Sequence, residues 1–350
     1  MDRILGQPGA VESLRAGLRS GRLAHAWIFA GPRGVGKFTT AIELARIVLD
    51  RHDDGETSRL IDAGVHPDLH VIRKELALYS PDPDIRKRKQ LNISVGVLRQ
   101  HMIGGQVGEK YQEAPAYRTP ALGHNKVFII DEAELLDAVG QNALLKTLEE
   151  PPAGTYIILV TNRPQRLLPT VHSRCRHLHF RPLDDAAMAQ WFDRSEVDAS
   201  GAERQWINDF CDGSPGVASL AAQYGFYRWH TTLAPMLEDL AVGRYPAAMG
   251  ETLAALVEGF AVEWVKRHEN ASKDAANKDG LRFILSILAA HANRQLAESV
   301  QRGTDAEPAM KAIDLIAEAE AQAWAYVNLK LLLENLVVQW ARVGATAVAP

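Results

Sequence analysis

The sequence has 350 residues, of which 47% are hydrophobic and 23% charged, and its formal net charge is −4. This composition is typical of a globular protein of two or three domains, and it excludes a protein that binds nucleic acid through a globally basic surface. The two cysteines, Cys175 and Cys211, are too few for a disulfide framework or a four-cysteine zinc site. The sequence has neither a signal-peptide pattern nor an apolar run of about 18 residues, so a cytoplasmic protein without a membrane span is expected.

The first half of the chain alternates short apolar runs with helical patterns. Helices are predicted at 8–20, from 39 onward and at 141–152. Strands are predicted at 25–31, at 66–72, in the four apolar residues that precede the acidic pair within 126–134, at 155–162 and at 176–180. Because the strands are apolar throughout, the pattern indicates a parallel sheet covered by helices on both faces. Residues 73–90, rich in charge and proline, are predicted to form a mobile loop.

From about residue 183 onward the pattern is helical and contains no convincing strand. The stretch GSPG at 213–216 separates two short helices, and the polar stretch 268–280 is predicted to be a linker. The last helix is amphipathic, with Tyr326, Leu329, Leu333, Leu336 and Trp340 on one face.

The stretch GPRGVGKFTT at 31–40 matches the phosphate-binding pattern G-x-x-x-x-G-K-[ST] except at its last position. Gly31, Gly34 and Gly36 would let backbone N–H groups cradle phosphate oxygens, and Lys37 would neutralise the outer phosphates. Phe38 stands where a hydroxyl should hold magnesium. Thr39 comes one residue later, about 100° around the helix, and therefore faces elsewhere. A glycine-rich turn without a ligand is the alternative interpretation.

Three further features could complete a nucleotide site. Asp131 and Glu132 follow an apolar strand, where acids hold magnesium and polarise an attacking water in phosphate-loop enzymes; a polar strand end is the alternative. Asn162 ends the next strand and could position water, although a turn residue explains it as well. Arg174 could reach the nucleotide of a neighbouring subunit, or it could pair with a local acid at the surface.

Four stretches together resemble the clamp-loader subunits of bacterial DNA polymerase III, which belong to the AAA+ superfamily. They are HAWIFAGPRGVGK, KVFIIDEAELL with NALLKTLEEPP, LVTNRP with LLPTVHSRC, and GSPG. The C-terminal NLKLLLENLVVQWAR resembles the last collar helix of the same family. The resemblance implies an α/β P-loop AAA+ domain over 1–182, a small helical lid over 183–226 and an all-α collar domain over 227–350.

Within this family the chain is more similar to delta-prime subunits than to the gamma/tau motor. Phe38 replaces the magnesium-binding hydroxyl, and Gly216 stands where active loaders have the arginine of G-S-x-R. The four-cysteine zinc module of many relatives is missing, because residues 50–66 contain no cysteine. The resemblance therefore implies a degenerate nucleotide site, with ATP and magnesium as candidate cofactors and without zinc.

The resemblance further implies a subunit of a hetero-oligomer that has weak or no ATPase activity alone and donates Arg174 in trans. The implied partners are the gamma/tau and delta subunits and, through the complex, the sliding clamp and primed DNA. The alternative is an active gamma/tau-type motor, favoured by Lys37, Asp131, Glu132 and Asn162. A third class, a small-molecule phosphoryl-transfer enzyme on the same fold, is disfavoured because the helical half has no evident substrate pocket.

Two features stay open at this point. The basic run RKRK, within the loop 84–90, is either a solvated loop or a DNA contact. The apolar face of the C-terminal helix serves the core, an interface in the collar, or both.

Overall fold

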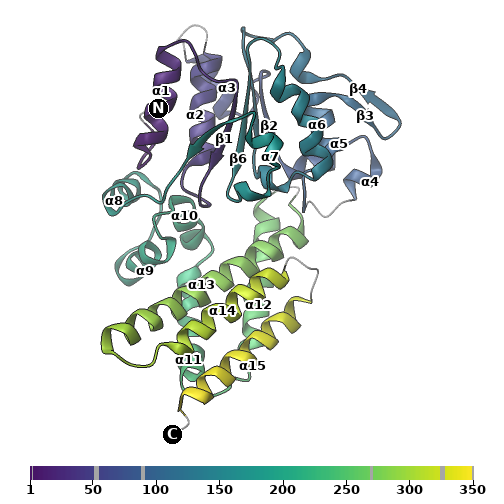
Figure 1. Cartoon of the computed structure of the whole chain (residues 1–350). Helices are drawn as coiled ribbons and strands as arrows, with labels where there is room; N and C mark the ends of the chain where they lie inside the picture. The colour runs from purple at the N-terminus through teal and green to yellow at the C-terminus, as the bar shows by residue number, and fades with distance from the viewer. Residues whose placement is uncertain (2, 51–54, 88–90, 269–270, 324–327, 349–350) are drawn as a thin grey trace. The chain divides into compact units, whose positions relative to one another are not determined.

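The computed structural model describes residues 1, 3–50, 55–87, 91–268, 271–323 and 328–348 (Figure 1). The chain divides into two compact units, Met1–Val197 with Cys211–Ser219, and Asp198–Phe210 with Leu220–Pro350. The division into three domains at 182 and 226 stays a prediction. Among the described helices, none is both long and apolar enough to cross a membrane.

The first unit is an α/β structure. Its parallel strands are β1 (Ala26–Ala30), β2 (Leu69–Ile72), β5 (Lys126–Ile130), β6 (Thr155–Thr161) and β7 (Arg176–His179). Its helices are α1 (Pro8–Arg19), α2 (Lys37–Leu49), α3 (Glu56–Asp62), α4 (Pro83–Arg86), α5 (Val95–Leu98), α6 (Ala138–Glu149), α7 (Pro169–His172) and α8 (Asp185–Arg194). Short 3-10 or π-helical turns are η1 (Lys74–Tyr79), η2 (Arg99–Ile103), η3 (Pro115–Tyr117), η4 (Ala133–Leu135) and η5 (Pro164–Arg166).

The five strands form one sheet in the order β2-β5-β6-β1-β7, and all neighbours are parallel. Figure 1 shows α1, α2 and α3 on one side of the sheet and α5 and α6 on the other. Alternate side chains of each strand reach opposite faces: Trp27 and Phe29 pack with α1 and α2, whereas Ile28 packs with α5 and α6. The parallel sheet with helices on both faces is confirmed.

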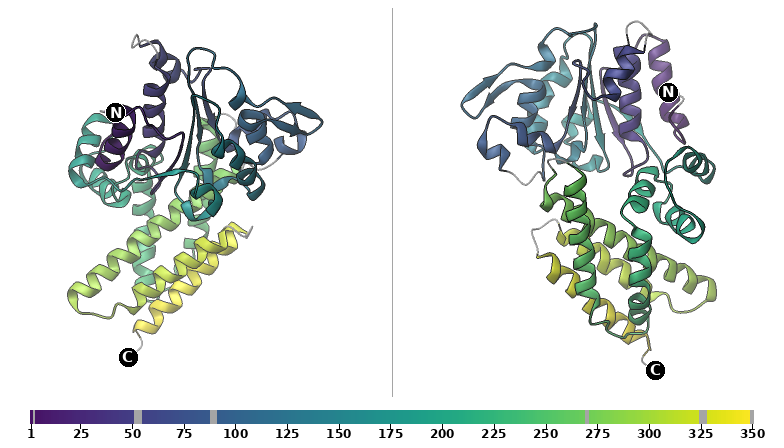
Figure 2. Two further views of the ribbon diagram at one scale, coloured as in Figure 1. Left: turned by 45° about the horizontal axis from the view of Figure 1, so that its top comes forward. Right: turned by 180° about the vertical axis from the view of Figure 1, so that it is seen from behind.

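The stretch 73–90 differs from the loop predicted for it. It contains η1 and α4, and Ala77 and Ile85 are buried in the core on the α5 and α6 side. The prediction of a loop was wrong because charged residues and prolines dominate this stretch, in which few apolar residues pack into the core. A second, antiparallel pair of strands, β3 (Gly105–Val107) and β4 (Lys110–Gln112), was not predicted and projects from the unit (Figure 2). Residues 88–90 lie outside the described part of the chain.

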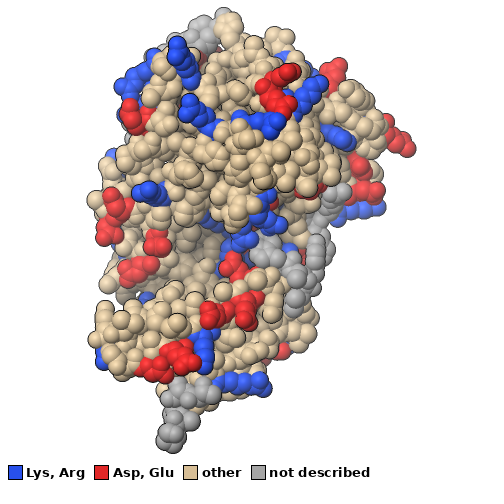
Figure 3. Space-filling model, in the orientation of Figure 1, with Lys and Arg blue, Asp and Glu red and all other residues tan. Residues whose placement is uncertain are grey.

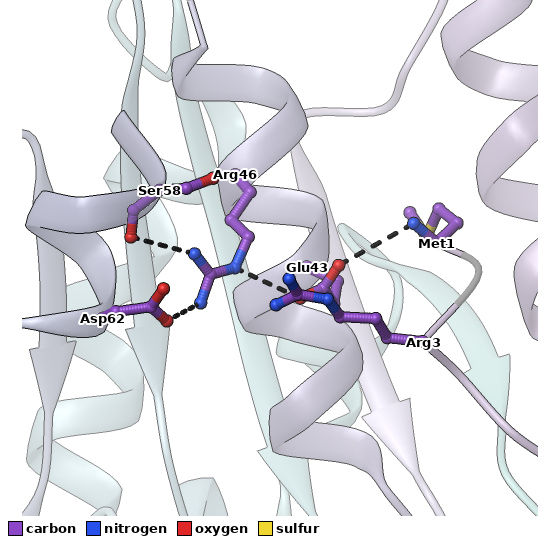
Figure 4. A network of polar contacts seen from close by, with 6 residues as sticks. All are labelled: Met1, Arg3, Glu43, Arg46, Ser58 and Asp62. Carbon is purple, nitrogen blue, oxygen red and sulfur yellow. Dashed lines mark hydrogen bonds and ion pairs between the residues drawn. The ribbon is translucent and has the colours of Figure 1, made fainter. Parts of the chain in front are cut away.

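Arg46 ties α2 to α3 on the outer side of the sheet (Figure 4). Its guanidinium lies 3.1 Å from Glu43 of the same helix, donates to the Ser58 carbonyl at 3.0 Å and pairs with Asp62. Glu43 is also approached by the amino group of Met1 at 3.7 Å. The Glu43 and Arg46 side chains are mostly shielded from water, so this network fixes how α2 lies beside α3. Because α2 directly follows the glycine loop, the network also supports the position of that loop.

The second unit is helical. It contains most of α9 (Gly201–Cys211), the end of α10 (Pro215–Gln223), and α11 (Phe226–Ala241), α12 (Met249–Arg267), α13 (Lys273–Arg302), α14 (Glu307–Ala323) and α15 (Leu329–Val348). An aromatic cluster joins α11, α12 and α13, with the Phe226 ring 4.8 Å from Phe283 and 6.3 Å from Phe260. The absence of strands after residue 183 is confirmed for the described residues.

The predicted linker 268–280 is wrong from residue 273 onward, because α13 begins there. Ser272 caps this helix by accepting from the Ala275 N–H, and Ala276 and Gly280 are buried. The polar residues from 273 to 280 therefore belong to the partly exposed first two turns of α13 and not to a linker; residues 269–270 lie outside the described part. In α15, Leu333, Leu336 and Trp340 are buried as expected, whereas Tyr326 is outside the described residues.

Candidate nucleotide-binding edge of the sheet

The glycine loop, Asp131 and Asn162 lie at the carboxyl edge of the sheet, whereas Arg174 precedes β7 and lies at its amino end. The glycine loop follows β1, Asp131 follows β5 and Asn162 follows β6, the strand between them. The Gly31 N–H donates to the Thr161 carbonyl at 3.3 Å, which places the half-buried Asn162 beside the start of the loop. Ligands of open α/β sheets bind at this edge, where strand order changes direction.

The glycine loop has the backbone of a phosphate-binding turn. Gly34 and Gly36 have φ of +79° and +95°, which side chains rarely allow, and α2 begins directly afterwards at Lys37. The Lys37 amine donates to the carbonyls of Gly31, at 2.8 Å, and Pro32. Burial lowers the pKa of Lys37 to about 8, against the opposing charges of Glu134 and Asp131. The lysine is thus held inside the loop, close to the acids.

The first turn of α2 carries Phe38 where the pattern requires a hydroxyl. Phe38 is half-buried and packs against the core between the sheet and the α1–α2 layer. Thr39 is exposed, as its rotation around the helix predicts, and the Thr40 hydroxyl donates to the Gly36 carbonyl at 2.9 Å. The Arg73 guanidinium lies over the Phe38 ring, 4.4 Å from its centre, in a cation–π contact.

Both acids after β5 are paired with cations of this chain. Arg73 Nε lies 3.1 Å from Asp131 Oδ2, and Lys74 Nζ lies 2.9 Å from Glu132 Oε2. Burial raises the pKa of Asp131, an effect that the Arg73 charge opposes. Glu132 has φ of 56°, a left-handed conformation that is uncommon outside glycine.

Arg73 and Lys74 were missed by the sequence reasoning, which treated them as part of a loop. The register of the two strands, which the sequence does not reveal, explains why they meet the acids. Ile72 of β2 is paired with Ile130 of β5, so the two residues that follow β2 lie beside the two that follow β5. Arg-Lys after one strand and Asp-Glu after its parallel neighbour therefore form two ion pairs.

The residues present do not fit a magnesium ion at this edge. Phe38 offers no oxygen, and Asp131 and Glu132 are each occupied by a cationic side chain. Glu134 is buried, and its Oε2 has no hydrogen-bond partner among the described residues, but its charge acts on Lys37, whose pKa it raises. Within the described residues, no group of three or more His, Cys, Asp or Glu side chains could hold a metal.

The GSPG stretch packs directly on the glycine loop. The Ser214 hydroxyl donates to the Arg33 carbonyl at 2.7 Å, and the Gly216 N–H donates to the Gly34 carbonyl at 2.9 Å. A Cβ atom at position 216 would lie 2.7 Å from the Gly34 Cα, closer than real Cβ contacts. Backbone contact therefore requires glycine here, and no arginine fits at this position without a shift of the chain.

Arg174 lies between α7 and β7, the strand at one edge of the sheet. Its guanidinium pairs with Glu149, with Nε 2.7 Å from Oε1, and donates to the Thr170 carbonyl at 2.9 Å. The side chains of Arg174 and Glu149 are 31% and 49% exposed. The local acid considered as the alternative partner of this arginine is therefore present, in an ion pair that water reaches.

The basic loop 84–90 is described only through residue 87. Within that part, the Arg86 guanidinium donates to the Ser80 carbonyl at 2.6 Å and so stabilises its own turn. On the face drawn in Figure 3, outside the grey atoms, basic and acidic side chains occur in small groups of both signs. No broad basic surface covers that face.

Comparison with known proteins finds relatives among the subunits of DNA polymerase III. The family described as "DNA polymerase III, delta subunit" matches residues 6–184. DNA polymerase III subunit delta' of Bacillus subtilis is 32% identical over 52% of this chain and 50% of its own length, and that of Escherichia coli is 31% identical over 65% and 63%. The gamma/tau subunit of Mycobacterium bovis is 34% identical over 53% of this chain and 29% of its own length.

The chain thus spans half or less of the Bacillus and Mycobacterium relatives. The family match covers just over half of its residues, including the glycine loop, both acids and Arg174. The resemblance to clamp-loader subunits is confirmed, and the chain belongs to the DNA polymerase III delta subunit family of AAA+ clamp-loader proteins.

Proposed function

We propose that the chain is a delta-prime-like subunit of the DNA polymerase III clamp loader, with weak or no ATPase activity of its own. It forms a fixed part of a cytoplasmic complex with gamma/tau and delta subunits. It donates Arg174 to a neighbouring ATP site while the complex loads the sliding clamp on primed DNA. The observation that carries this proposal is the backbone contact between Gly216 and Gly34, which leaves no space for the lid arginine of an active loader.

Arg174 supports the second part of the proposal. A cation that stabilises charge in phosphoryl transfer must leave its resting partner at little cost. The Glu149 pair meets this condition because exposed ion pairs contribute little free energy. In the assembled complex, a triphosphate of the neighbour would offer Arg174 a denser negative charge than Glu149 does.

The test is reconstitution with gamma/tau and delta subunits. We expect the chain to co-purify with them. Arg174→Ala should lower ATP hydrolysis at the neighbouring site that it completes by about 10³-fold, and so lower the rate of the assembly without dissolving it. Arg176→Ala is the matched control, because Arg176 is an exposed arginine two residues away. Failure to co-purify, or an unchanged rate with Arg174→Ala, would contradict the proposal.

The gamma/tau-type motor is the second candidate, and Lys37 favours it because the amine is still held within the glycine loop. In that case the chain alone would hydrolyse ATP, and Lys37→Ala would abolish the activity. Measurement of turnover by the isolated chain separates the two candidates.

A further inference from the structure

We propose that Arg73 is a built-in counter-ion that takes the place of a divalent metal at the glycine loop, so that any nucleotide held there is bound without magnesium. The inference deepens the proposed function, because it concerns the same loop. Its test uses nucleotide binding by the chain alone, so it can fail while assembly with other subunits succeeds, and the reverse.

The first support is the position of the guanidinium. Arg73 contacts two groups that would flank a metal: the Asp131 carboxylate, at 3.1 Å, and the side chain at position 38, 4.4 Å from the ring centre. In an active phosphate-loop site, a hydroxyl at the position of Phe38 and an acid at the position of Asp131 hold the magnesium ion between them. Here a single planar cation bridges both positions, and it pairs with the carboxylate and stacks on the ring.

The second support is that the arrangement follows from the register of the sheet and not from one flexible side chain. Ile72 pairs with Ile130, and the Asp131 N–H donates to the Ile72 carbonyl at 3.0 Å. The backbone that leads into Arg73 and Asp131 is therefore fixed by the sheet. Lys74 repeats the arrangement one residue later by pairing with Glu132 at 2.9 Å.

Phe38 and Arg73 each provide a contact that the other needs. A hydroxyl at position 38 would leave the face of the guanidinium without its aromatic contact. A phenylalanine without Arg73 would leave the mostly buried Asp131 carboxylate without its hydrogen-bonded partner. The phenylalanine is thus one half of a cation-binding pair and not merely a lost ligand.

The experiment is an equilibrium titration of the full chain with a fluorescent ATP analogue, in magnesium and in EDTA at equal ionic strength. For the wild-type chain we expect affinities that differ less than about twofold between the two conditions, or no binding in either. For the double variant Phe38→Ser, Arg73→Ala we expect binding at least about tenfold tighter in magnesium. Adding Asp131→Asn should remove that preference.

The single variant Phe38→Ser decides what blocks the metal. It restores the hydroxyl but keeps Arg73 on Asp131, so we expect no preference for magnesium. The proposal is overturned if this variant alone gains the full preference, if the wild-type chain already has it, or if the double variant lacks it. Arg73→Gln replaces Arg73→Ala if circular dichroism shows that the alanine variant does not fold, and Arg118→Ala, which breaks the exposed pair with Glu113, is the control.

Discussion

Two arginine–carboxylate pairs in the α/β unit differ in how firmly their environment holds them. Arg73, which is 45% exposed, lies between Asp131, which is 22% exposed, and the Phe38 ring, at the edge where a nucleotide would bind. Arg174, which is 31% exposed, pairs with Glu149, which is 49% exposed, beside an edge strand. A carboxylate that is exposed is screened by water and salt, so its pair exchanges partners at little cost, whereas the Asp131 carboxylate is mostly buried and its arginine has an aromatic contact in addition. The comparison suggests that Arg73 neutralises the carboxylate at the candidate nucleotide-binding edge, whereas Arg174 can exchange Glu149 for another anionic partner.

The largest effect on stability should come from disrupting the contact between the glycine loop and the GSPG stretch at Gly34. Gly34→Ala should destabilise the folded state by about 2–4 kcal/mol, since φ is +79° and the new Cβ would lie 2.9 Å from the Val217 nitrogen. Gly36→Ala is the control, because its φ is +95° but its Cβ would meet open space, so only the backbone strain of about 1–2 kcal/mol remains. Urea unfolding measures both. Equal losses would show that the GSPG stretch does not pack on the loop.

The affinity of the glycine loop for anions should fall at high pH. The amine of Lys37 binds phosphate as the ammonium, and its pKa in the folded chain is about 8. Below that pH the group is charged and binding is at its maximum; above it, the dissociation constant should rise about tenfold for each pH unit. Titration with ATP in EDTA between pH 7 and 9.5 measures this.

Lys37→Arg is the control for that titration, because arginine stays charged throughout the range. Its binding should vary little between pH 7 and 9.5. A wild-type chain that binds equally well at both ends of the range would show that Lys37 does not hold the anion.

The smallest effect should be the coupling free energy of the two arginine–carboxylate pairs, measured in double-mutant cycles. Arg73 and Asp131 should be coupled by about 1 kcal/mol and Arg174 and Glu149 by less than about 0.5 kcal/mol, because the Glu149 carboxylate is more exposed to water than the Asp131 carboxylate. Thermal or urea unfolding of the single and double alanine variants gives both values. A stronger coupling for the Arg174 pair would reverse the comparison and remove the reason for regarding it as exchangeable.

The sequence predicted the fold well where periodicity was strong. The parallel strands and the helices 8–20 and 141–152 followed from unbroken apolar runs and helical spacing. The α/β edge was also predictable, because Asp131 and Asn162 each follow such a run. What could not be predicted was strand order, and without it Arg73 and Lys74 had no reason to meet Asp131 and Glu132.

Two errors have a related cause. In 73–90 and 268–280, charged and polar residues outnumbered the few buried ones, so the patterns indicated a loop and a linker. Ile85 and Ala276 are nevertheless buried in the folded chain, and burial by tertiary packing is not visible in local composition. The contact between Gly216 and Gly34 is of the same kind, since it joins residues far apart in the chain through their backbones.

The most direct test of the account is ATP hydrolysis by the purified chain alone in saturating MgATP. The account predicts no turnover above that of the buffer, and no change with Lys37→Ala, because the edge of the sheet is already neutralised by this chain's own cations. Magnesium-dependent turnover of about 1 s⁻¹ or faster that Lys37→Ala abolishes would contradict it.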